Sequence, residues 1–226
     1  MIDTLLSFVA PHHCSGCAQI GSLLCDNCKY DITQEPYGAC CACGKGLVTA
    51  KGLCGSCRVP YERAWCVADR RDQLQRLIGN YKFTNTRAAY RPLADLLHAH
   101  LPELPSNVVI VPVPTVNSHI RQRGYDHMLL VANRLAKLRG ISVATDLQRA
   151  TNTKQRAAGR AQRIKQAKKA FMCQKSLDPS LIYLLIDDVI TTGSTVKYAS
   201  QTLIDAGAQT VWVASISRQP LETSEF

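Results

Sequence analysis

The residues best suited to chemistry near the start of the chain are cysteines. Eight of the eleven cysteines form four CxxC pairs. Two such pairs supply four thiolates and close a tetrahedral zinc site with no open position for catalysis. We therefore expect structural Zn²⁺ sites, with sequential or interleaved pairing both compatible with the spacing. The ligands are Cys14, Cys17, Cys25, Cys28, Cys40, Cys43, Cys54 and Cys57.

Zinc is not the only use that these cysteines could have. Disulfides or an iron–sulfur cluster would also employ paired cysteines, and Cys41 could replace Cys40 as a ligand. Paired thiols in CxxC units suit a reducing compartment, so we expect a cytoplasmic protein. The first ten residues lack a basic leader, which predicts no signal peptide. No apolar run approaches the roughly 20 residues of a membrane span.

A second group of reactive residues lies near the end of the chain, where a strongly apolar run meets two acids and then small hydroxyl residues. Backbone amides at the start of a helix can hold a phosphate, and a glycine permits close approach. The neighbouring carboxylates can accept hydrogen bonds from ribose hydroxyls. The sequence therefore predicts a ribose phosphate site. Its residues are Asp187, Asp188, Val189, Thr191, Thr192, Gly193, Ser194 and Thr195.

Two other phosphate or metal chemistries fit this segment less well. The chain lacks GxxxxGK[ST], which disfavours a nucleoside triphosphatase. Two acids after a strand could hold Mg²⁺ directly, as in receiver-like folds, but the hydroxyl-rich loop would then have no role.

The positive charge is concentrated in one part of the chain. The whole protein carries a formal net charge of +10, and residues 118–175 contain fourteen Lys and Arg against two Asp and Glu. A polyanionic partner such as single-stranded DNA would balance this surplus, while a solvated basic helix is the simpler alternative. Arg156, Arg160 and Arg163 have helical spacing. With them, the candidate nucleic-acid contacts are Lys165, Lys168 and Lys169.

These groups need a scaffold, and the hydrophobic pattern predicts one. Apolar runs at 64–70, 108–113, 181–186 and 210–216 indicate strands. Helical periodicity is found at 74–78, 92–101, 128–138 and 195–206. Strands that alternate with helices imply an α/β fold with a parallel central sheet and a site at the carboxyl ends of its strands. We expect a zinc-ribbon module over 1–62 and the α/β domain over 63–226.

The segment from Leu184 to Thr195 resembles the phosphoribosyl pyrophosphate (PRPP) signature of type I phosphoribosyltransferases. Together with the four CxxC pairs, VVIVPVPT from Val108 and RQRGYDH from Arg121, it resembles the ComF family (ComFC/GntX-like) of DNA-uptake competence proteins over nearly the whole chain. The resemblance implies a type I phosphoribosyltransferase-like fold behind a double zinc ribbon. It places pyrophosphate, with Mg²⁺, at a set of four residues. These are Val113, Pro114, Thr115 and Arg121.

The resemblance also bears on mobility and on one departure from the family. Asp126 stands where the family usually has Asn, which puts an acid near the expected anion site. The spacing of the family's mobile segment is matched by Arg149, Thr153, Gln155, Arg160, Arg163 and Phe171.

Two functions follow from the resemblance. One is PRPP binding in DNA uptake and natural transformation, with single-stranded DNA and a competence helicase as partners. The other is an active phosphoribosyltransferase whose acceptor the sequence does not identify, since no base-recognition segment is evident. A phosphoribosyl-binding fold does not by itself establish transfer.

Overall fold

The computed structural model describes residues 11–84, 86–150 and 170–220. Its centre is a parallel sheet of five strands in the order β1-β7-β6-β2-β3, beside a two-stranded antiparallel ribbon of β4 and β5. The strands are β1 Arg63–Asp69, β2 Val108–Pro112, β3 Ser142–Val143, β4 Leu147–Arg149, β5 Phe171–Cys173, β6 Ile182–Ile190 and β7 Thr210–Arg218. Among the described residues, no helix is long and apolar enough to span a bilayer.

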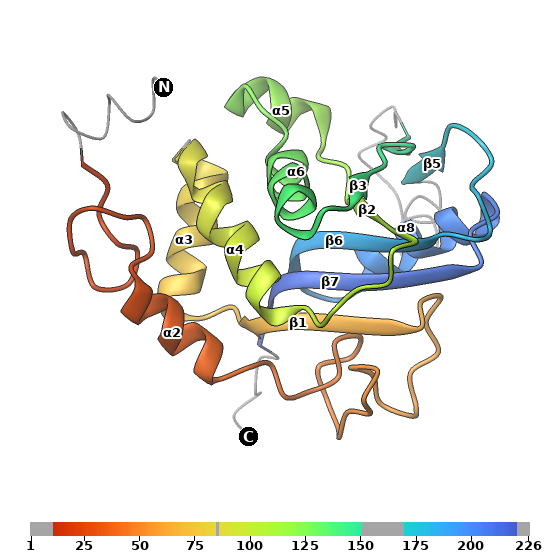
Figure 1. Cartoon of the computed structure of the whole chain (residues 1–226), viewed down its shortest axis with the longest axis horizontal. Coiled ribbons are helices and arrows are strands. Elements are labelled where there is room, and N and C mark those ends of the chain that lie inside the picture. Colours follow the sequence, from red (N-terminus) through yellow and green to blue (C-terminus); the bar gives the residue numbers. More distant parts are fainter. Residues whose placement is uncertain (1–10, 85, 151–169, 221–226) are drawn as a thin grey trace, which may run out of the picture.

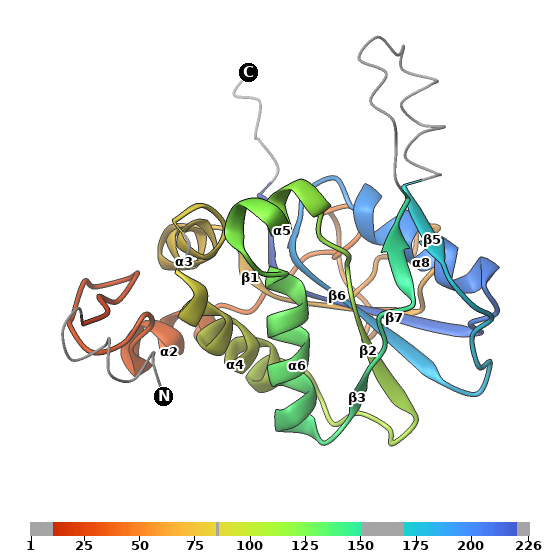
Figure 2. The ribbon, with the colours of Figure 1, turned by 90° about the horizontal axis from the view of Figure 1, so that it is seen from above.

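The helices cover both faces of this sheet, as Figures 1 and 2 show. Helices α3, α4 and α6 pack on one face, and α8 packs on the other. Their bounds and those of the shorter helices are α2 Asp26–Gln34, α3 Asp72–Phe83, η1 Arg87–Ala89, α4 Tyr90–His100, α5 Asn117–Arg123, α6 His127–Arg139 and α8 Ser194–Asp205. The predicted α/β fold with a parallel sheet is therefore confirmed.

The core divides between the two faces with the period of two that a strand dictates. Along β6, Leu184 and Ile186 face the α3, α4 and α6 layer, while Leu185 between them faces α8. All three side chains are fully buried. A strand buried on both faces must be continuously apolar, which is the pattern that identified β6 in the sequence.

β6 extends four residues beyond its predicted end. It runs to Ile190, so Asp187 and Asp188 lie inside the strand rather than after it. The reason is that β7 also runs on, and Asp187 pairs with Ser215 while Ile190 pairs with Arg218. The sheet therefore fixes the backbone of the acid pair.

The second cysteine segment, residues 40–57, and the residues just before it cover the free edge of β1. The amide of Ala64 donates to Lys51 O (2.8 Å), and the amide of Tyr37 donates to Val67 O (3.2 Å). Gly52 has a positive φ of 73° and approaches so closely that a Cβ there would lie 1.8 Å from Ala64 O. These contacts blunt a strand edge that would otherwise expose unpaired amides.

Candidate ribose phosphate site and metal centres

Two groups of four cysteines are present, and both pair sequentially. Within each group the four sulfurs lie within 4.8 Å of one another. Tetrahedral zinc with Zn–S bonds of about 2.3 Å requires sulfurs about 3.8 Å apart, and the distance from Cys40 Sγ to Cys57 Sγ is 3.9 Å. The geometry therefore fits zinc. The first group is Cys14, Cys17, Cys25 and Cys28, and the second is Cys40, Cys43, Cys54 and Cys57.

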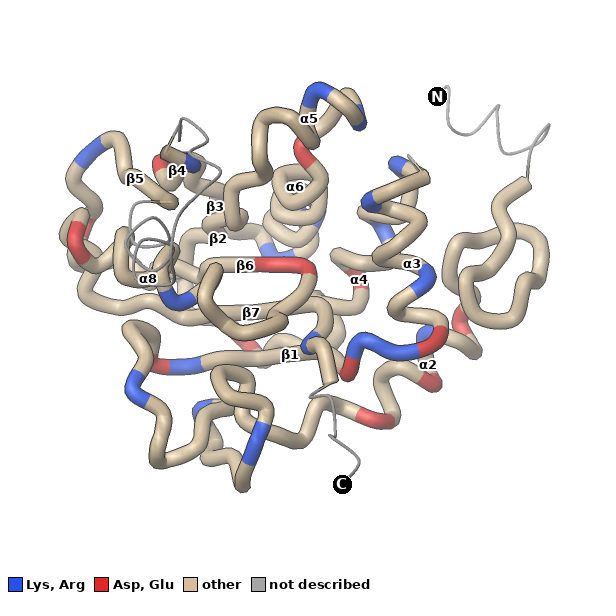
Figure 3. The backbone as a smooth tube through the Cα atoms, turned by 180° about the vertical axis from the view of Figure 1, so that it is seen from behind, with Lys and Arg blue, Asp and Glu red and all other residues tan. Residues whose placement is uncertain are grey.

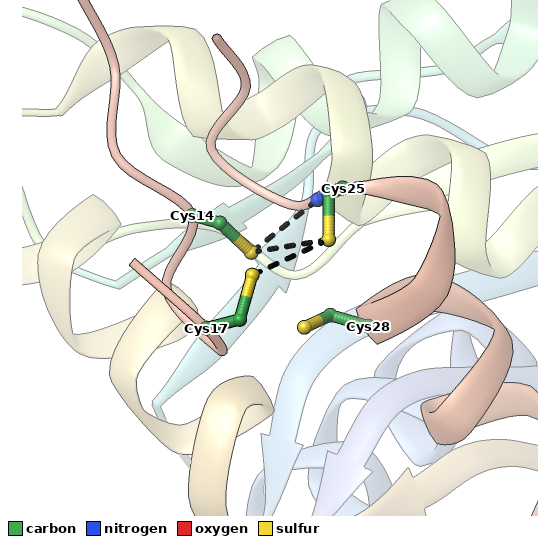
Figure 4. A group of neighbouring side chains, drawn as sticks. All are labelled: Cys14, Cys17, Cys25 and Cys28. Carbon is green, nitrogen blue, oxygen red and sulfur yellow. Dashed lines mark hydrogen bonds between the residues drawn. The ribbon is translucent and has the colours of Figure 1, made fainter. Parts of the chain in front are cut away.

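Backbone amides point at the sulfurs in both groups. In the first, shown in Figure 4, the amides of Gly16 and Cys25 each donate to Cys14 Sγ at 3.4 Å. Burial would raise the pKa of the Cys14 thiol, but these amide hydrogen bonds outweigh it and lower the pKa to about 6. In the second group the amide of Cys54 donates to Cys40 Sγ (3.2 Å). Such amides favour thiolate, the form that binds metal.

The remaining three cysteines are not part of either group. Cys41 and Cys66 are buried thiols, and burial raises the pKa of Cys41 to about 12 and that of Cys66 well above its usual value. Cys173 ends β5. All eleven cysteines fall within the described residues, and none of them forms a disulfide.

The other candidate site is a cavity of about 280 Å³ at the carboxyl ends of β2 and β6. Seven of the predicted site residues line it, and they come from two segments more than 70 residues apart. Those seven are Val113, Pro114, Thr115, Asp187, Asp188, Val189 and Thr195. A larger cavity of about 430 Å³ lies between α2, β1 and α3, but none of these residues lines it.

The two acids that line this cavity have different electrostatic surroundings. Lys82 Nζ and His127 Nε2 each lie 2.7 Å from Asp188 Oδ2. Burial would raise the pKa of Asp188, but His127 and Lys82 outweigh it and hold the pKa well below its usual range. For Asp187, burial and the negative charge of Asp188 raise the pKa to about 8. The two shifts run in opposite directions, so the pair favours a protonated Asp187 beside an ionised Asp188.

His127 connects the acid pair to the loop after β2. Its Nδ1 lies 2.9 Å from Thr115 Oγ1, and the Thr115 hydroxyl donates to Asp126 Oδ1 at 2.7 Å. Asp126 caps α6 and also accepts from the amides of Met128 (3.1 Å) and Leu129 (3.2 Å). The acid that replaces the family's usual Asn is thus satisfied by its own helix, where a negative charge is favourable.

Two arginines and a histidine join Lys82 and His127 around the cavity. Arg149 lines it from β4 and donates to Pro114 O (3.0 Å), and Arg123 lines it from α5 and donates to Lys82 O (2.7 Å). His119 lines it as well, whereas Arg121 is exposed on α5 and is not among the lining residues. In Figure 3 the end of β6 is red, while α3, to its right, and α5, above α6, carry blue segments.

The hydroxyl-rich loop Thr191–Gly193, which is the predicted phosphate loop, lies beside the cavity, at the N-terminus of α8. Gly193 caps this helix with a φ of 76°. The Thr192 hydroxyl donates to Ser194 Oγ (2.9 Å), and the first helical bond runs from the Lys197 amide to Gly193 O (3.0 Å). The amides of Thr195 and Val196 precede that bond and so lie outside the helical ladder. Thr191, Thr192 and Ser194 are exposed.

Several residues around the cavity were not assigned a role from the sequence. No sequence pattern pointed to a role for Lys82, because none predicts that α3 packs near the end of β6. His127 stood in the RQRGYDH element, and a histidine directly after an acid could have been flagged as a partner for the acid pair. The family resemblance implies a pyrophosphate contact at Arg121, which is not among the lining residues, whereas Arg123, two residues on, lines the cavity.

Part of the basic stretch, residues 118–175, lies outside the described residues. This holds for Thr153 and Gln155 and for all six candidate nucleic-acid contacts, namely Arg156, Arg160, Arg163, Lys165, Lys168 and Lys169. Within the described part, Arg134 pairs with Asp95 (2.7 Å), and Arg139 donates to the carbonyls of Leu101 and Pro102, directly after α4. These two arginines therefore have partners inside the protein.

Comparison with known proteins gives relatives of two names that match most of the chain. The chain is 30% identical to competence protein F of Haemophilus influenzae, over 91% of this chain and 95% of that protein. It is 29% identical to DNA utilization protein YhgH of Escherichia coli O6:H1, over 86% and 96%. No family model matches the chain.

Among solved structures, the chain is similar to phosphoribosyl enzymes. Glutamine PRPP amidotransferase from B. subtilis aligns with a TM-score of 0.40 at 18% identity, over 57% of this chain and 26% of that one. Adenine phosphoribosyltransferase from Trypanosoma brucei aligns with a TM-score of 0.38 at 19% identity, over 62% and 56%.

Proposed function

The chain belongs to the family of competence protein F, and from that premise we propose that it binds PRPP and acts in the handling of single-stranded DNA during DNA uptake. Its relatives are named for competence and for DNA utilization. The observation that carries the ligand is the convergence of an acid pair, a helix N-terminus and the loop after β2 on one cavity edge.

Each part of PRPP has a matching group at this edge. The 5′-phosphate would be held by the amides of Thr195 and Val196 and by the loop hydroxyls, where the helix dipole favours an anion. Asp187 and Asp188 would accept hydrogen bonds from the ribose hydroxyls. The pyrophosphate would lie against the loop Val113–Thr115, close to the cations of Arg149 and Arg123.

Mg²⁺ would enter with the pyrophosphate. The cation prefers one or two carboxylates together with phosphate oxygens and waters, and Asp187 and Asp188 line the cavity that would take the ligand. When bound, Mg²⁺ neutralises part of the pyrophosphate charge.

The DNA part of the proposal draws on charge. Seven of the fourteen Lys and Arg in the basic stretch fall within 151–169, and a polyanion would offset their mutual repulsion. A competence helicase remains the proposed protein partner.

Calorimetry tests the ligand. PRPP with Mg²⁺ should give saturable heat with the wild-type protein and bind at least tenfold more weakly to Asp187→Asn, because an amide accepts fewer hydrogen bonds than a carboxylate. Asp31→Asn, the same substitution at an exposed acid on α2, is the control. Absence of heat with the wild-type protein would remove PRPP from the account.

Fluorescence anisotropy with a labelled single-stranded oligonucleotide tests the DNA contact. Affinity should fall steeply as salt rises, and replacing Arg156, Arg160 and Arg163 by glutamine should reduce both the affinity and the slope. Affinity that stays flat over the same salt range would exclude this basic stretch as the contact.

The alternative, phosphoribosyl transfer, is favoured by one observation at the mouth of the cavity. Phe83 lines it with 75% of its surface exposed, and the partly exposed Val116 lines it as well. An apolar wall beside the ribose position suits a planar acceptor. Its nucleophile would form a bond to the anomeric carbon while pyrophosphate leaves. Pyrophosphate release with a panel of acceptors, reduced in Phe83→Ala, would support transfer, and no release with any acceptor would count against it.

A further inference from the structure

Arg218 at the end of β7 is the largest fully buried side chain of the described residues, with 2% of its surface exposed. Its Nη1 donates to Cys41 O at 2.7 Å. Gly44 is so near that a Cβ there would lie 2.8 Å from Arg218 Nε. The guanidinium is therefore inserted into the second cysteine segment, among the residues on either side of the ligand Cys43.

This buried cation lacks an acidic partner. Within the described residues Arg218 forms no ion pair, and its Nε has no hydrogen-bond partner. A buried charge without compensation is costly. Four thiolates around one Zn²⁺ carry a net charge of −2, so the second cysteine group, once loaded with metal, would supply the missing countercharge.

The backbone of the same residue holds the first end of the phosphate loop. Arg218 pairs with Ile190, the last residue of β6 before the loop. The Gln219 amide donates to Ile190 O (2.8 Å), and the Ser217 hydroxyl donates to Asp188 O (3.2 Å). The end of β7 thus fixes both the acid pair and the start of the loop.

The other end of the loop touches the same cysteine segment directly. A Cβ at Gly193 would lie 3.1 Å from Ala42 O. The peptide Cys41–Ala42 lies between the ligands Cys40 and Cys43, so both ends of the loop meet backbone that the second metal would hold. The Ile190 end does so through Arg218, and the Gly193 end does so by its close approach to Ala42 O.

The first cysteine group is placed differently. Arg76 of α3 donates to Ser15 O and Gly16 O at 2.6 and 3.3 Å, and Cys14 and Cys28 join the core under α3 and α4. In Figure 1 its segment lies beyond α2 and α3, at the opposite end of the molecule from α8, whereas the second segment lies along β1.

We propose that the second cysteine group is part of the anion site: through Arg218 and the carbonyls of Cys41 and Ala42, its metal positions the loop Thr191–Gly193, while the first group does not. Arg218 is a positioning residue, and the proposal rests on the proposed function of this loop as the phosphate site.

Two matched pairs of variants test this asymmetry. Cys54→Ser and Cys17→Ser each remove one thiolate, from the second and the first group. Arg218→Lys and Arg76→Lys each keep the charge but shorten a guanidinium that donates to a cysteine-segment carbonyl. Hydrogen exchange of the amides at 190–196 is the readout, since it requires no ligand and no activity.

Exchange at 190–196 should be at least tenfold faster in Cys54→Ser and Arg218→Lys and unchanged in Cys17→Ser and Arg76→Lys. PRPP affinity should fall at least tenfold in the same two variants. If Cys54→Ser does not fold, Arg218→Lys decides the matter alone. Equal exchange within the lysine pair would overturn the proposal. A wild-type protein that binds no PRPP would refute the proposed function instead, and the exchange result would still decide the positioning role.

Discussion

Asp187 is the residue at which site chemistry and folding stability should conflict most clearly. Burial and the charge of Asp188 raise its pKa from 3.8 to about 8. Between these two values the folded protein holds a proton that the unfolded chain releases. Asp187 therefore does not lower the free energy of unfolding below about pH 4, and it lowers that free energy increasingly as the pH rises toward 8.

The size of the effect follows from the shift. About four pKa units at 1.36 kcal/mol each correspond to roughly 5 kcal/mol at pH 9. In Asp187→Asn the amide oxygen can still accept the hydrogen bond from the Asp188 amide, which is 2.9 Å in the wild type. We expect the variant to exceed the wild type in free energy of unfolding by at least about 2 kcal/mol at pH 9, and by little at pH 5.

Urea denaturation at pH 5, 7 and 9 measures this difference, with zinc and salt held constant. Asp31→Asn again serves as the control for the same substitution at an exposed acid. The expected result is a stability gain that grows with pH in Asp187→Asn alone, together with weaker PRPP binding. A variant that is no more stable than the wild type at pH 9, or whose gain is the same at every pH, would refute the raised pKa.

Three further predictions concern other parts of the protein. Asp126→Ala should lower the free energy of unfolding by about 1 to 2 kcal/mol through loss of the α6 cap, while Asp126→Asn should retain most of it; thermal denaturation distinguishes the two. Native mass spectrometry should find two Zn²⁺ per chain, and one or none would contradict the two-site assignment. At pH 7, PRPP binding should release protons as Asp187 ionises to accept hydroxyl donors, so the heat of binding should vary with the ionisation heat of the buffer.

Much of the scaffold could be predicted from the sequence because its strands are buried on both faces. Continuous apolar runs identified β2, β6 and β7 and placed the acid pair at a strand end. The end of β6 was wrong by four residues, since local pattern does not report that β7 extends alongside Asp187 and Asp188. A strand's length is set by its neighbour as much as by its own residues.

The candidate site was predicted only where its residues are contiguous in the sequence. The hydroxyl loop and the acids are contiguous in sequence, and their types alone indicate a ribose phosphate. Lys82 and His127 reach Asp188 from two helices that are distant along the chain. Arg218 could not be identified either, because its role depends on how the second cysteine segment docks against β7. These are tertiary contacts, which hydrophobic periodicity does not encode.

The most direct test of the account is a crystal structure of the protein with PRPP and Mg²⁺. We predict the 5′-phosphate within hydrogen-bond distance of the amides of Thr195 and Val196, with the ribose hydroxyls on Asp187 and Asp188. A ligand bound elsewhere would contradict the proposed phosphate site. So would a 5′-phosphate that lies away from the α8 N-terminus although that terminus is accessible in the crystal.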